Sequence, residues 1–376
     1  MFIQRTIEAT IKNRLVAGKV NLLVGARRVG KTFLLKKIVQ DINEPYLWLN
    51  GDDESTHDLL AELTIANYRR ITSGISLLII DEAQMIKDIG LKMKLMIDEI
   101  PNLKIIASGS SVYALSYKVG EPLVGRAFWH KIFPIAQNEL KHHESYVDTV
   151  RNLEERLIYG GYPEMFQLTT LQEKEAYIKE ILNSYLFKDL LVFDEIRSSD
   201  KSRTLLKLVA FQLGKEVSYD ELGKQLGMSK NTVEKYLDLL SKIFVVYKVG
   251  AYSKNLRKEL SKSSRWYFYD NGIRNALIDN FKPLSLRNDV GELWENYLMV
   301  ERLKKNNYEQ NFKEIYFWRT YDQQEIDYIE EKNQEIEAFE FKWGNTKAKI
   351  PVAFENAYPE AKFSIISKEN YLDFIE

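Results

Sequence analysis

Eight consecutive residues, Gly25 to Thr32, have the types and the spacing needed to hold a polyphosphate. They read GARRVGKT and fit the pattern G-x-x-x-x-G-K-[ST]. Glycines let the backbone curl so that successive N–H groups, with the positive end of a following helix, can bind phosphate oxygens. Lys31 is predicted to reach the β- and γ-phosphates, and the Thr32 hydroxyl to ligate Mg²⁺. With Gly25 and Gly30, these residues predict a site for ATP and Mg²⁺.

Two acids follow an apolar run about fifty residues further along the chain. The stretch SLLIIDEAQ places Leu77 to Ile80 directly before Asp81 and Glu82. Four apolar residues in a row are typical of a buried parallel strand. Asp81 is predicted to hold the Mg²⁺ shell, and Glu82 to polarise the attacking water.

A third strand-like run, LKIIASGSS, ends in serines. Ser110 is predicted to lie beside the γ-phosphate as a sensor, although a serine-rich turn would have the same sequence. The run NLLV before Gly25, the helical pattern FLLKKIV after Thr32 and the strand-like YLWLN indicate alternating strands and helices. This alternation predicts an α/β fold with a parallel sheet, helices on both faces and the ligand at the carboxyl edge.

The composition narrows the class of protein. The chain has 376 residues, 45% of them hydrophobic, with a net charge of -1 and no cysteine. Several domains are expected at this length, and thiol nucleophiles, disulfides and thiolate metal sites are excluded. The first residues have no signal-peptide character, and no run approaches the roughly 20 apolar residues of a membrane span. The sequence therefore predicts a soluble, cytoplasmic protein without a membrane partner.

Five stretches together resemble a prokaryotic family of AAA-type ATPases related to the archaeal and signal-transducing P-loop ATPases, over essentially the whole chain. They are LLVGARRVGKT, LLIIDEAQ, ASGSS, LVGRAFWHKIFPI and YGGYPE. The resemblance implies that Pro163 lies against the nucleotide base. It also implies that Arg126 contacts a phosphate, either its own or that of a neighbouring subunit, although a structural salt bridge would equally explain this arginine.

The middle of the chain is basic and has the spacing of a helix-turn-helix. Residues 201–269 hold 14 Lys and Arg against 6 Asp and Glu. Ser218 and Glu221 form a capping-box pattern, Gly227 allows a turn, and Ser229 can cap a second helix. Two strand-like runs around a basic loop follow, which together predict a winged helix-turn-helix.

In the functional interpretation, the second helix enters the major groove of DNA and the basic wing contacts the phosphates. In the alternative, the winged helix is a packing module whose charged face is only solvated. The expected DNA contacts are Lys230, Asn231 and Lys235 on the second helix, and Lys254, Arg257 and Lys258 in the loop, which also holds Lys262 and Arg265.

The carboxyl end resembles the PD-(D/E)xK nuclease core. Asp327 lies in the strand-like QEIDYIE, and Glu340 and Lys342 follow in EAFEFKW, where strand side chains alternate. Two carboxylates at a sheet edge can hold Mg²⁺ while a lysine orients the attacking water. Glu295, on a predicted helix before them, could supply a further acid. Ile326 stands where the usual motif has proline. A fold of this kind does not fix an activity.

These elements predict four domains: an ATPase domain in 1–165, a helical linker in 166–200, the winged helix in 201–284 and a small α/β nuclease-like domain in 285–376. We interpret the chain as a DNA-binding ATPase whose nucleotide state controls the nuclease-like domain, in defence or mobile-element biology. The alternative is an ATP-operated switch or assembly platform whose nuclease fold only binds, and a transcription regulator is a third hypothesis. A homo-oligomer and a partner protein stay open.

Overall fold

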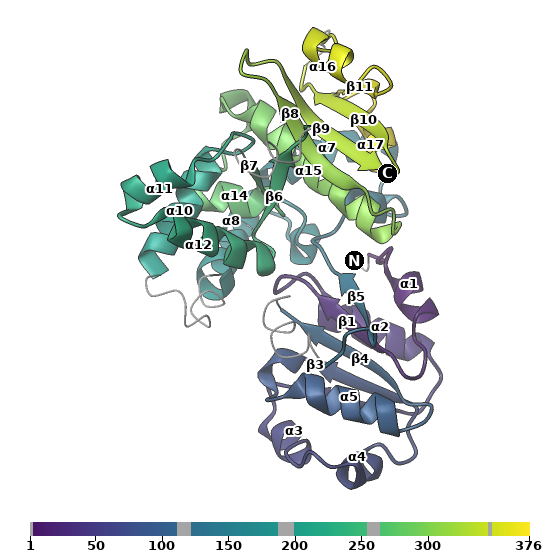
Figure 1. Ribbon diagram of the computed structural model, residues 1–376. Coiled ribbons are helices and arrows are strands. Elements are labelled where there is room, and N and C mark those ends of the chain that lie inside the picture. Colours follow the sequence, from purple (N-terminus) through teal and green to yellow (C-terminus); the bar gives the residue numbers. More distant parts are fainter. Residues whose placement is uncertain (1–2, 111–121, 187–198, 254–263, 345–347) are drawn as a thin grey trace. The chain divides into compact units, whose positions relative to one another are not determined.

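The chain folds as two compact units. The computed structural model describes residues 3–110, 122–186, 199–253, 264–344 and 348–376 (Figure 1). The N-terminal unit comprises Phe2–Phe133 and Lys242–Phe244, and the C-terminal unit comprises Pro134–Ser241 and Val245–Glu376. The first domain is predicted to end at residue 165, whereas the first long segment of the N-terminal unit ends at Phe133.

The N-terminal unit is built on a five-stranded parallel sheet, which confirms the predicted α/β architecture. The strand order is β2-β3-β4-β1-β5. The strands are β1 (Val20–Val24), β2 (Tyr46–Asn50), β3 (Leu77–Asp81), β4 (Lys104–Gly109) and β5 (Ala127–Lys131). The helices are α1 (Glu8–Asn13), α2 (Lys31–Asp41), α3 (Glu54–Leu59), α4 (Ile65–Ile71) and α5 (Ile89–Glu99), with the 3-10 turn η1 (Ala83–Met85).

The chain reverses its direction across this sheet after β2. From β1 it crosses to the far edge through α2, and from β2 it returns through α3, α4 and α5. Because crossovers between parallel strands are right-handed, helices on the outward and return paths cover opposite faces. Loops that follow the carboxyl ends of β1, β3 and β4 therefore meet at one edge, where ligands bind in such sheets.

The C-terminal unit combines helices with a mixed six-stranded sheet. Its strands are β6 (Val246–Ala251), β7 (Ser264–Phe268), β8 (Glu314–Arg319), β9 (Glu325–Lys332), β10 (Glu335–Phe341) and β11 (Lys362–Ile366). Its α-helices are α7 (Tyr146–Tyr159), α8 (Leu171–Ile181), α10 (Ser199–Phe211), α11 (Tyr219–Leu226), α12 (Lys230–Lys242), α14 (Asn271–Leu277), α15 (Val290–Tyr308), α16 (Val352–Ala357) and α17 (Tyr371–Ile375). Shorter helical turns are η2 (Gln137–Leu140), η3 (Pro163–Phe166), η4 (Leu182–Leu186) and η5 (Leu284–Leu286). In the part of the chain that the structure describes, we find no helix with the length and apolar character of a membrane span.

The strands of the predicted wing belong to the same sheet as the carboxyl-terminal strands. The sheet order is β11-β10-β9-β8-β6-β7, and β6 pairs in parallel with β8 through Gly250 and Ala251. A domain boundary at residue 284 would cut between strands that share backbone hydrogen bonds. The segments on either side of residue 284 lie in one compact unit because β6 and β8 pair, and the boundary between two domains there stays a prediction.

Two helices, α11 and α12, lie where the sequence predicts the helix-turn-helix. Ser218 accepts a hydrogen bond from the backbone N–H of Glu221 at the start of α11, and Gly227 ends that helix with a φ of 59°. Ser229 accepts from the backbone N–H of Thr232 as α12 begins. The inner residues of α12 are fully buried: Val233, Leu237 and Leu240.

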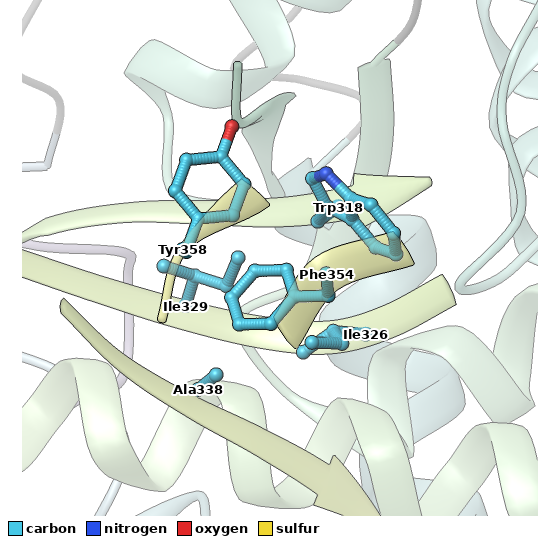
Figure 2. Packing of buried hydrophobic residues seen from close by; sticks show 6 residues of the cluster. All are labelled: Trp318, Ile326, Ile329, Ala338, Phe354 and Tyr358. Atoms are coloured by element: carbon cyan, nitrogen blue, oxygen red, sulfur yellow. The ribbon is translucent and has the colours of Figure 1, made fainter. Parts of the chain in front are cut away.

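A cluster of buried hydrophobic residues packs α16 against β8, β9 and β10 (Figure 2). Phe354 of α16 packs edge-on against Trp318 of β8, with ring centroids 5.1 Å apart, and Ile326, Ile329, Ala338 and Tyr358 complete the cluster. Ile326 and Ile329 share this face although three residue steps separate them. This is possible because the β8–β9 register shifts: Tyr316 pairs with Ile329 and Trp318 with Ile326. The extra residue on β9 is a bulge at Asp327 and Tyr328, and bulges re-aim side chains.

Candidate functional site

The glycine-rich loop connects β1 directly to α2, as the motif requires. β1 is buried over its whole length, and Gly30 caps α2 in the left-handed region with a φ of 94°. A Cβ on Gly25 would lie 2.1 Å from the carbonyl oxygen of Ile132, so only glycine fits there. Lys31 is buried, and its ammonium group donates to the carbonyl oxygens of Gly25 and Ala26 at 2.8 and 2.9 Å. The lysine is thus held inside the curl of the loop.

Asp81 stands at the carboxyl end of β3, within reach of the loop. Its Oδ2 accepts a hydrogen bond from the Thr32 hydroxyl at 2.8 Å, and its Oδ1 accepts one from the Ser108 hydroxyl. The structure therefore brings together the two residues predicted to ligate Mg²⁺. Ser108 belongs to the same serine run as Ser110, the residue predicted to be the sensor, but no role was predicted for Ser108.

Glu82 is held in a sharp turn after the strand. Its backbone lies in the left-handed region, with φ 49° and ψ 41°, a conformation that costs a non-glycine residue of order 1 kcal/mol or more. Gln84 Nε2 donates to the Glu82 carboxylate at 2.6 Å and lies 3.3 Å from the Ser110 hydroxyl. Ser110, the predicted sensor, is therefore connected to Glu82 through Gln84. Gln84 follows the acids by two residues, and only that proximity could have drawn attention to it.

The loop backbone is also supported from behind by an arginine that the sequence analysis missed. Arg5 is buried and donates to the carbonyl oxygen of Val29 at 2.8 Å and to that of Phe133 at 2.6 Å. Val29 is the residue before Gly30. Arg5 therefore stabilises the loop conformation at the point where the backbone turns into α2.

These residues fit a magnesium–nucleotide complex. A curled loop ending in a left-handed glycine exposes N–H groups to phosphate oxygens, and α2 adds its positive end. Thr32 and Asp81 supply neighbouring oxygen ligands of the kind Mg²⁺ prefers. Lys31 supplies a positive charge for phosphate oxygens, and Glu82 a carboxylate close by.

Arg126 lies at the other edge of the same sheet. It directly precedes β5, whose first residue pairs with Val20 at the start of β1, and its guanidinium forms an ion pair with Asp98 at 2.8 Å. The loop begins after the last residue of β1. At about 3.3 Å per residue, the five residues of β1 place the loop well over 10 Å from Arg126. This distance is incompatible with a contact to the phosphates of its own site, so of the phosphate interpretations only the contact to a neighbouring subunit stays open.

The GGYP segment in the C-terminal unit closes around Asp270. Gly160 ends α7 with a φ of 79°, and a Cβ there would lie 2.0 Å from Asp270 Oδ1. The backbone N–H of Gly161 donates to Asp270 Oδ2 at 2.8 Å. Burial raises the pKa of Asp270 to about 6. Pro163 begins the turn η3, and its contact with a nucleotide base stays a prediction.

The outer face of α12 carries the residues predicted to contact DNA. Lys230, Asn231 and Lys235 are exposed, and Lys230 lies 3.8 Å from Asp220. Glu234 is also exposed on this helix, so the charge of its outer face is mixed. The loop residues Lys254, Arg257, Lys258 and Lys262 lie outside the described residues.

Arg265, which the sequence analysis counted with the basic loop, is not exposed to solvent. Only 3% of the residue is accessible. Its guanidinium contacts the carboxylate of Glu325 at 2.8 Å, that of Glu295 at 3.6 Å and that of Asp327 at 4.0 Å. It also lies 4.5 Å from the ring centre of Phe317. Arg265 is therefore not part of an exposed basic loop, because β7 carries it into the interior.

The acids predicted to hold a second Mg²⁺ do lie near one another. Burial, followed by the nearby Glu295 and Glu340, raises the pKa of Asp327 well above its usual value. Burial likewise raises the pKa of Glu295 to about 7, and its carboxylate accepts a hydrogen bond from Tyr267 at 2.6 Å. Lys342 donates to Glu340 at 2.6 Å. The sequence thus selected residues that the fold brings together.

Their arrangement does not fit a divalent ion. Asp327 Oδ2 is used by the backbone N–H of Phe341 at 2.8 Å, beyond the Tyr328–Phe339 pair where the β9–β10 register ends. The Arg265 guanidinium stands among the acids. At 4 Å and a dielectric constant of about 20, two unit charges repel by about 4 kcal/mol, and a divalent ion doubles this. Over the described residues, no three acidic or histidine side chains are grouped closely enough to hold a metal.

Family models cover most of the chain in three consecutive segments. Residues 17–141 match an AAA domain, 150–284 a domain of unknown function (DUF8612) and 290–373 another domain of unknown function (DUF4143). With the loop and acids described above, the first match supports a P-loop domain of the AAA type in residues 17–141.

Several proteins are similar over most of their length. The uncharacterized protein MJ1544 of Methanocaldococcus jannaschii is 22% identical over 93% of this chain and 78% of its own. The uncharacterized protein Rv2008c of Mycobacterium tuberculosis is 25% identical over 91% of this chain and 74% of its own. Among solved structures, the Walker-type ATPase PABY2304 of Pyrococcus abyssi aligns with 73% of this chain and 94% of its own, at 17% identity and a TM-score of 0.49.

Proposed function

We propose that this protein is a Mg²⁺-dependent ATPase that binds DNA through α11 and α12 and uses its nucleotide state to control the C-terminal unit. The observation that carries the ATPase is the meeting of the loop with β3: the Thr32 hydroxyl bonded to Asp81 at 2.8 Å, with Lys31 inside the loop and Glu82 following the strand. The AAA-domain match over residues 17–141 supports it.

Each residue of the proposed site has a role that follows from its chemistry. Lys31 and the loop N–H groups bind the phosphates, while Thr32 and Asp81 hold the metal. Bound Mg²⁺ neutralises charge on the β- and γ-phosphate oxygens. Glu82 orients the attacking water and accepts its proton, and Gln84 keeps the Glu82 carboxylate in place through its 2.6 Å hydrogen bond.

Replacing Lys31 tests the nucleotide site. We expect Lys31→Ala to weaken the binding of ATP with Mg²⁺ by at least about tenfold, because the cation that pairs with the phosphates is lost from a buried position. Isothermal titration calorimetry on both proteins measures this. Lys37→Ala, which removes a partly exposed lysine of the same helix, should leave the affinity unchanged. Wild-type protein that binds neither ATP nor GTP would contradict the proposal.

Support for DNA binding comes from the geometry of α12. Its three predicted contacts are exposed in the first half of the helix, and recognition helices present their N-terminal residues to base edges. A segment with 14 basic and 6 acidic residues surrounds them. Phosphate contacts of this kind position a protein without reading a sequence, so the proposal specifies no base sequence.

The DNA interface predicts a salt-dependent affinity. We expect binding of a fluorescent duplex to weaken steeply with salt. The double variant Lys230→Ala/Lys235→Ala should lower the slope of log K against log salt by about 1 for each phosphate that the missing lysines no longer neutralise. Fluorescence anisotropy at several salt concentrations gives the slope. Lys37→Ala is again the matched control. An affinity that does not respond to salt, or a double variant with the wild-type slope, speaks against this interface.

The sequence leaves two interpretations of the nuclease-like domain, one in which it cleaves DNA and one in which it only binds. The position of Arg265 among Glu295, Glu325 and Asp327 favours a nuclease-like fold that binds without cleaving. The protein then acts as an ATP-operated switch on DNA. A homo-oligomer in which Arg126 serves the neighbouring nucleotide, a partner protein, and a place in defence or mobile-element biology are all compatible with this proposal.

A further inference from the structure

Three acids in the C-terminal unit already have a cation, and this cation is a side chain of the same protein. Arg265 is carried by β7, Glu295 by α15, and Glu325 and Asp327 by β9. Arg265 is 3% accessible, and its guanidinium lies within 4.0 Å of all three carboxylates. A charge buried this deeply is stable only when it is paired.

The arginine is also fixed in position by its surroundings. One face of its guanidinium lies 4.5 Å from the ring centre of Phe317 on β8, a distance at which a cation is attracted to the ring. The backbone of Arg265 pairs with Val249 on one side and with Glu216 on the other. Strand pairing and ring contact therefore place the charge among the acids independently of the ion pairs.

The carboxylates of Asp327 and Glu295 also accept hydrogen bonds from other groups of the protein. Asp327 Oδ2 accepts from the Phe341 backbone at 2.8 Å, and Glu295 Oε1 accepts from the Tyr267 hydroxyl at 2.6 Å. Lys342, which a nuclease would use on water, donates to Glu340 at 2.6 Å. The other carboxylate oxygen of Glu340, Oε2, is buried and receives no hydrogen bond from the described residues.

We infer that Arg265 is the resident cation of this acidic cluster, and that in this fold it takes the place where a nuclease of the same general architecture would bind a divalent metal. The C-terminal domain then does not bind Mg²⁺ at these acids and does not cleave phosphodiesters. The inference concerns a site separate from the nucleotide loop and does not rest on the proposed ATPase.

Removing the guanidinium tests this directly. In Arg265→Met, whose side chain is uncharged and of similar length, the acids lose their cation. We expect this variant to gain an Mn²⁺ site that the wild type lacks, at least about tenfold tighter than any residual Mn²⁺ binding by the wild type, because the guanidinium no longer repels the ion from the carboxylates. The measurement is calorimetric titration of the full-length protein with Mn²⁺ alone, without nucleotide. Adding Asp327→Asn to this variant should remove the new site.

Arg302→Met is the matched control. Arg302 is also a largely enclosed arginine, with 11% of its side chain accessible and 2.8 Å hydrogen bonds to both oxygens of Glu330. Lys313 pairs with the same carboxylate at 2.6 Å, so the loss of Arg302 leaves a cation behind and should create no metal site. A gain of Mn²⁺ binding in both arginine variants would overturn the inference, because it would then follow from the loss of any buried arginine.

The wild-type protein provides a test that needs no arginine variant to fold. We expect its Mn²⁺ titration to match that of Asp327→Asn, and its nicking of plasmid DNA with Mg²⁺ or Mn²⁺ to stay at the level of Lys342→Ala. Wild-type Mn²⁺ binding or nicking that these variants lose would show a working metal site and overturn the inference. A folded Arg265→Met protein, judged by circular dichroism, that gains no site would do the same.

Discussion

Glu82→Gln is expected to bind ATP with the wild-type affinity, within a few-fold, and to hydrolyse it at least about a hundredfold more slowly. The expectation follows from proton chemistry: a positioned general base contributes roughly 10²- to 10⁴-fold to a rate, and an amide cannot accept the proton from water. Size is preserved, and the Gln84 donor at 2.6 Å can still bond to the amide oxygen. Phosphate release and calorimetric ATP binding, measured on the same preparation, separate the two effects.

Two further variants sharpen this result. Glu99→Gln alters an exposed acid at the end of α5 and should leave turnover unchanged. Gln84→Ala keeps the carboxylate but removes its donor, so turnover should fall by an intermediate factor. If Glu82→Gln hydrolyses ATP at the wild-type rate, Glu82 has no part in the reaction, whatever its position beside Asp81.

The nucleotide site could be predicted from the sequence because its signals are local. The strand, the loop and α2 are contiguous, so periodicity and the glycine pattern place Lys31 and Thr32 without knowledge of the remaining fold. Asp81 follows from a four-residue apolar run, since the carboxyl ends of parallel strands share an edge. The sequence does not distinguish which serine after the third strand-like run lies closest to the acids. Ser108 is still within β4 and reaches Asp81 itself, whereas Ser110 lies two residues beyond, and the ends of strands are where sequence patterns carry least information.

The environment of Arg265 could not be predicted, because its partners are distant in sequence. Its bond to Glu325 spans 60 residues, and it depends on β6 pairing with β8 so that the predicted wing and the carboxyl-terminal strands form one sheet. In the sequence, Arg265 simply ends a run of exposed-looking lysines and arginines. Local charge indicates a solvated or phosphate-binding surface, and only the sheet order reveals a buried cation.

The GGYP segment also has a partner that is distant in sequence. The family resemblance implies a nucleotide contact for this segment, and the fold shows that its glycines also pack against Asp270. Asp270 caps α14 by accepting from the Ile273 backbone at 3.2 Å, and it also accepts from Gly161 at 2.8 Å. Nothing near Gly160 in the sequence indicates this partner more than one hundred residues away. The glycines are therefore needed for packing whether or not Pro163 touches a base.

Gly160→Ala is accordingly expected to lower the free energy of unfolding by roughly 2 to 6 kcal/mol. The backbone there has φ 79° and ψ -160°, a region that is essentially restricted to glycine and costs other residues of order 1 to 3 kcal/mol. The new Cβ would also lie 2.0 Å from Asp270 Oδ1, and an overlap in a packed interior adds about 1 to 3 kcal/mol. Because Asp270 is buried and held by two backbone donors, it has little room to move. Urea unfolding followed by circular dichroism measures the change.

Gly291→Ala is the natural control for this substitution. Gly291 lies near the start of α15, where an added Cβ meets no atom within 4 Å, and alanine should stabilise the helix by about 0.5 to 1 kcal/mol. The two glycine variants are therefore expected to shift stability in opposite directions. A Gly160→Ala protein as stable as the wild type would mean that the turn can open away from Asp270. The strained conformation would then be a preference of the segment, and the packing around Asp270 would not be what holds α7 and α14 together.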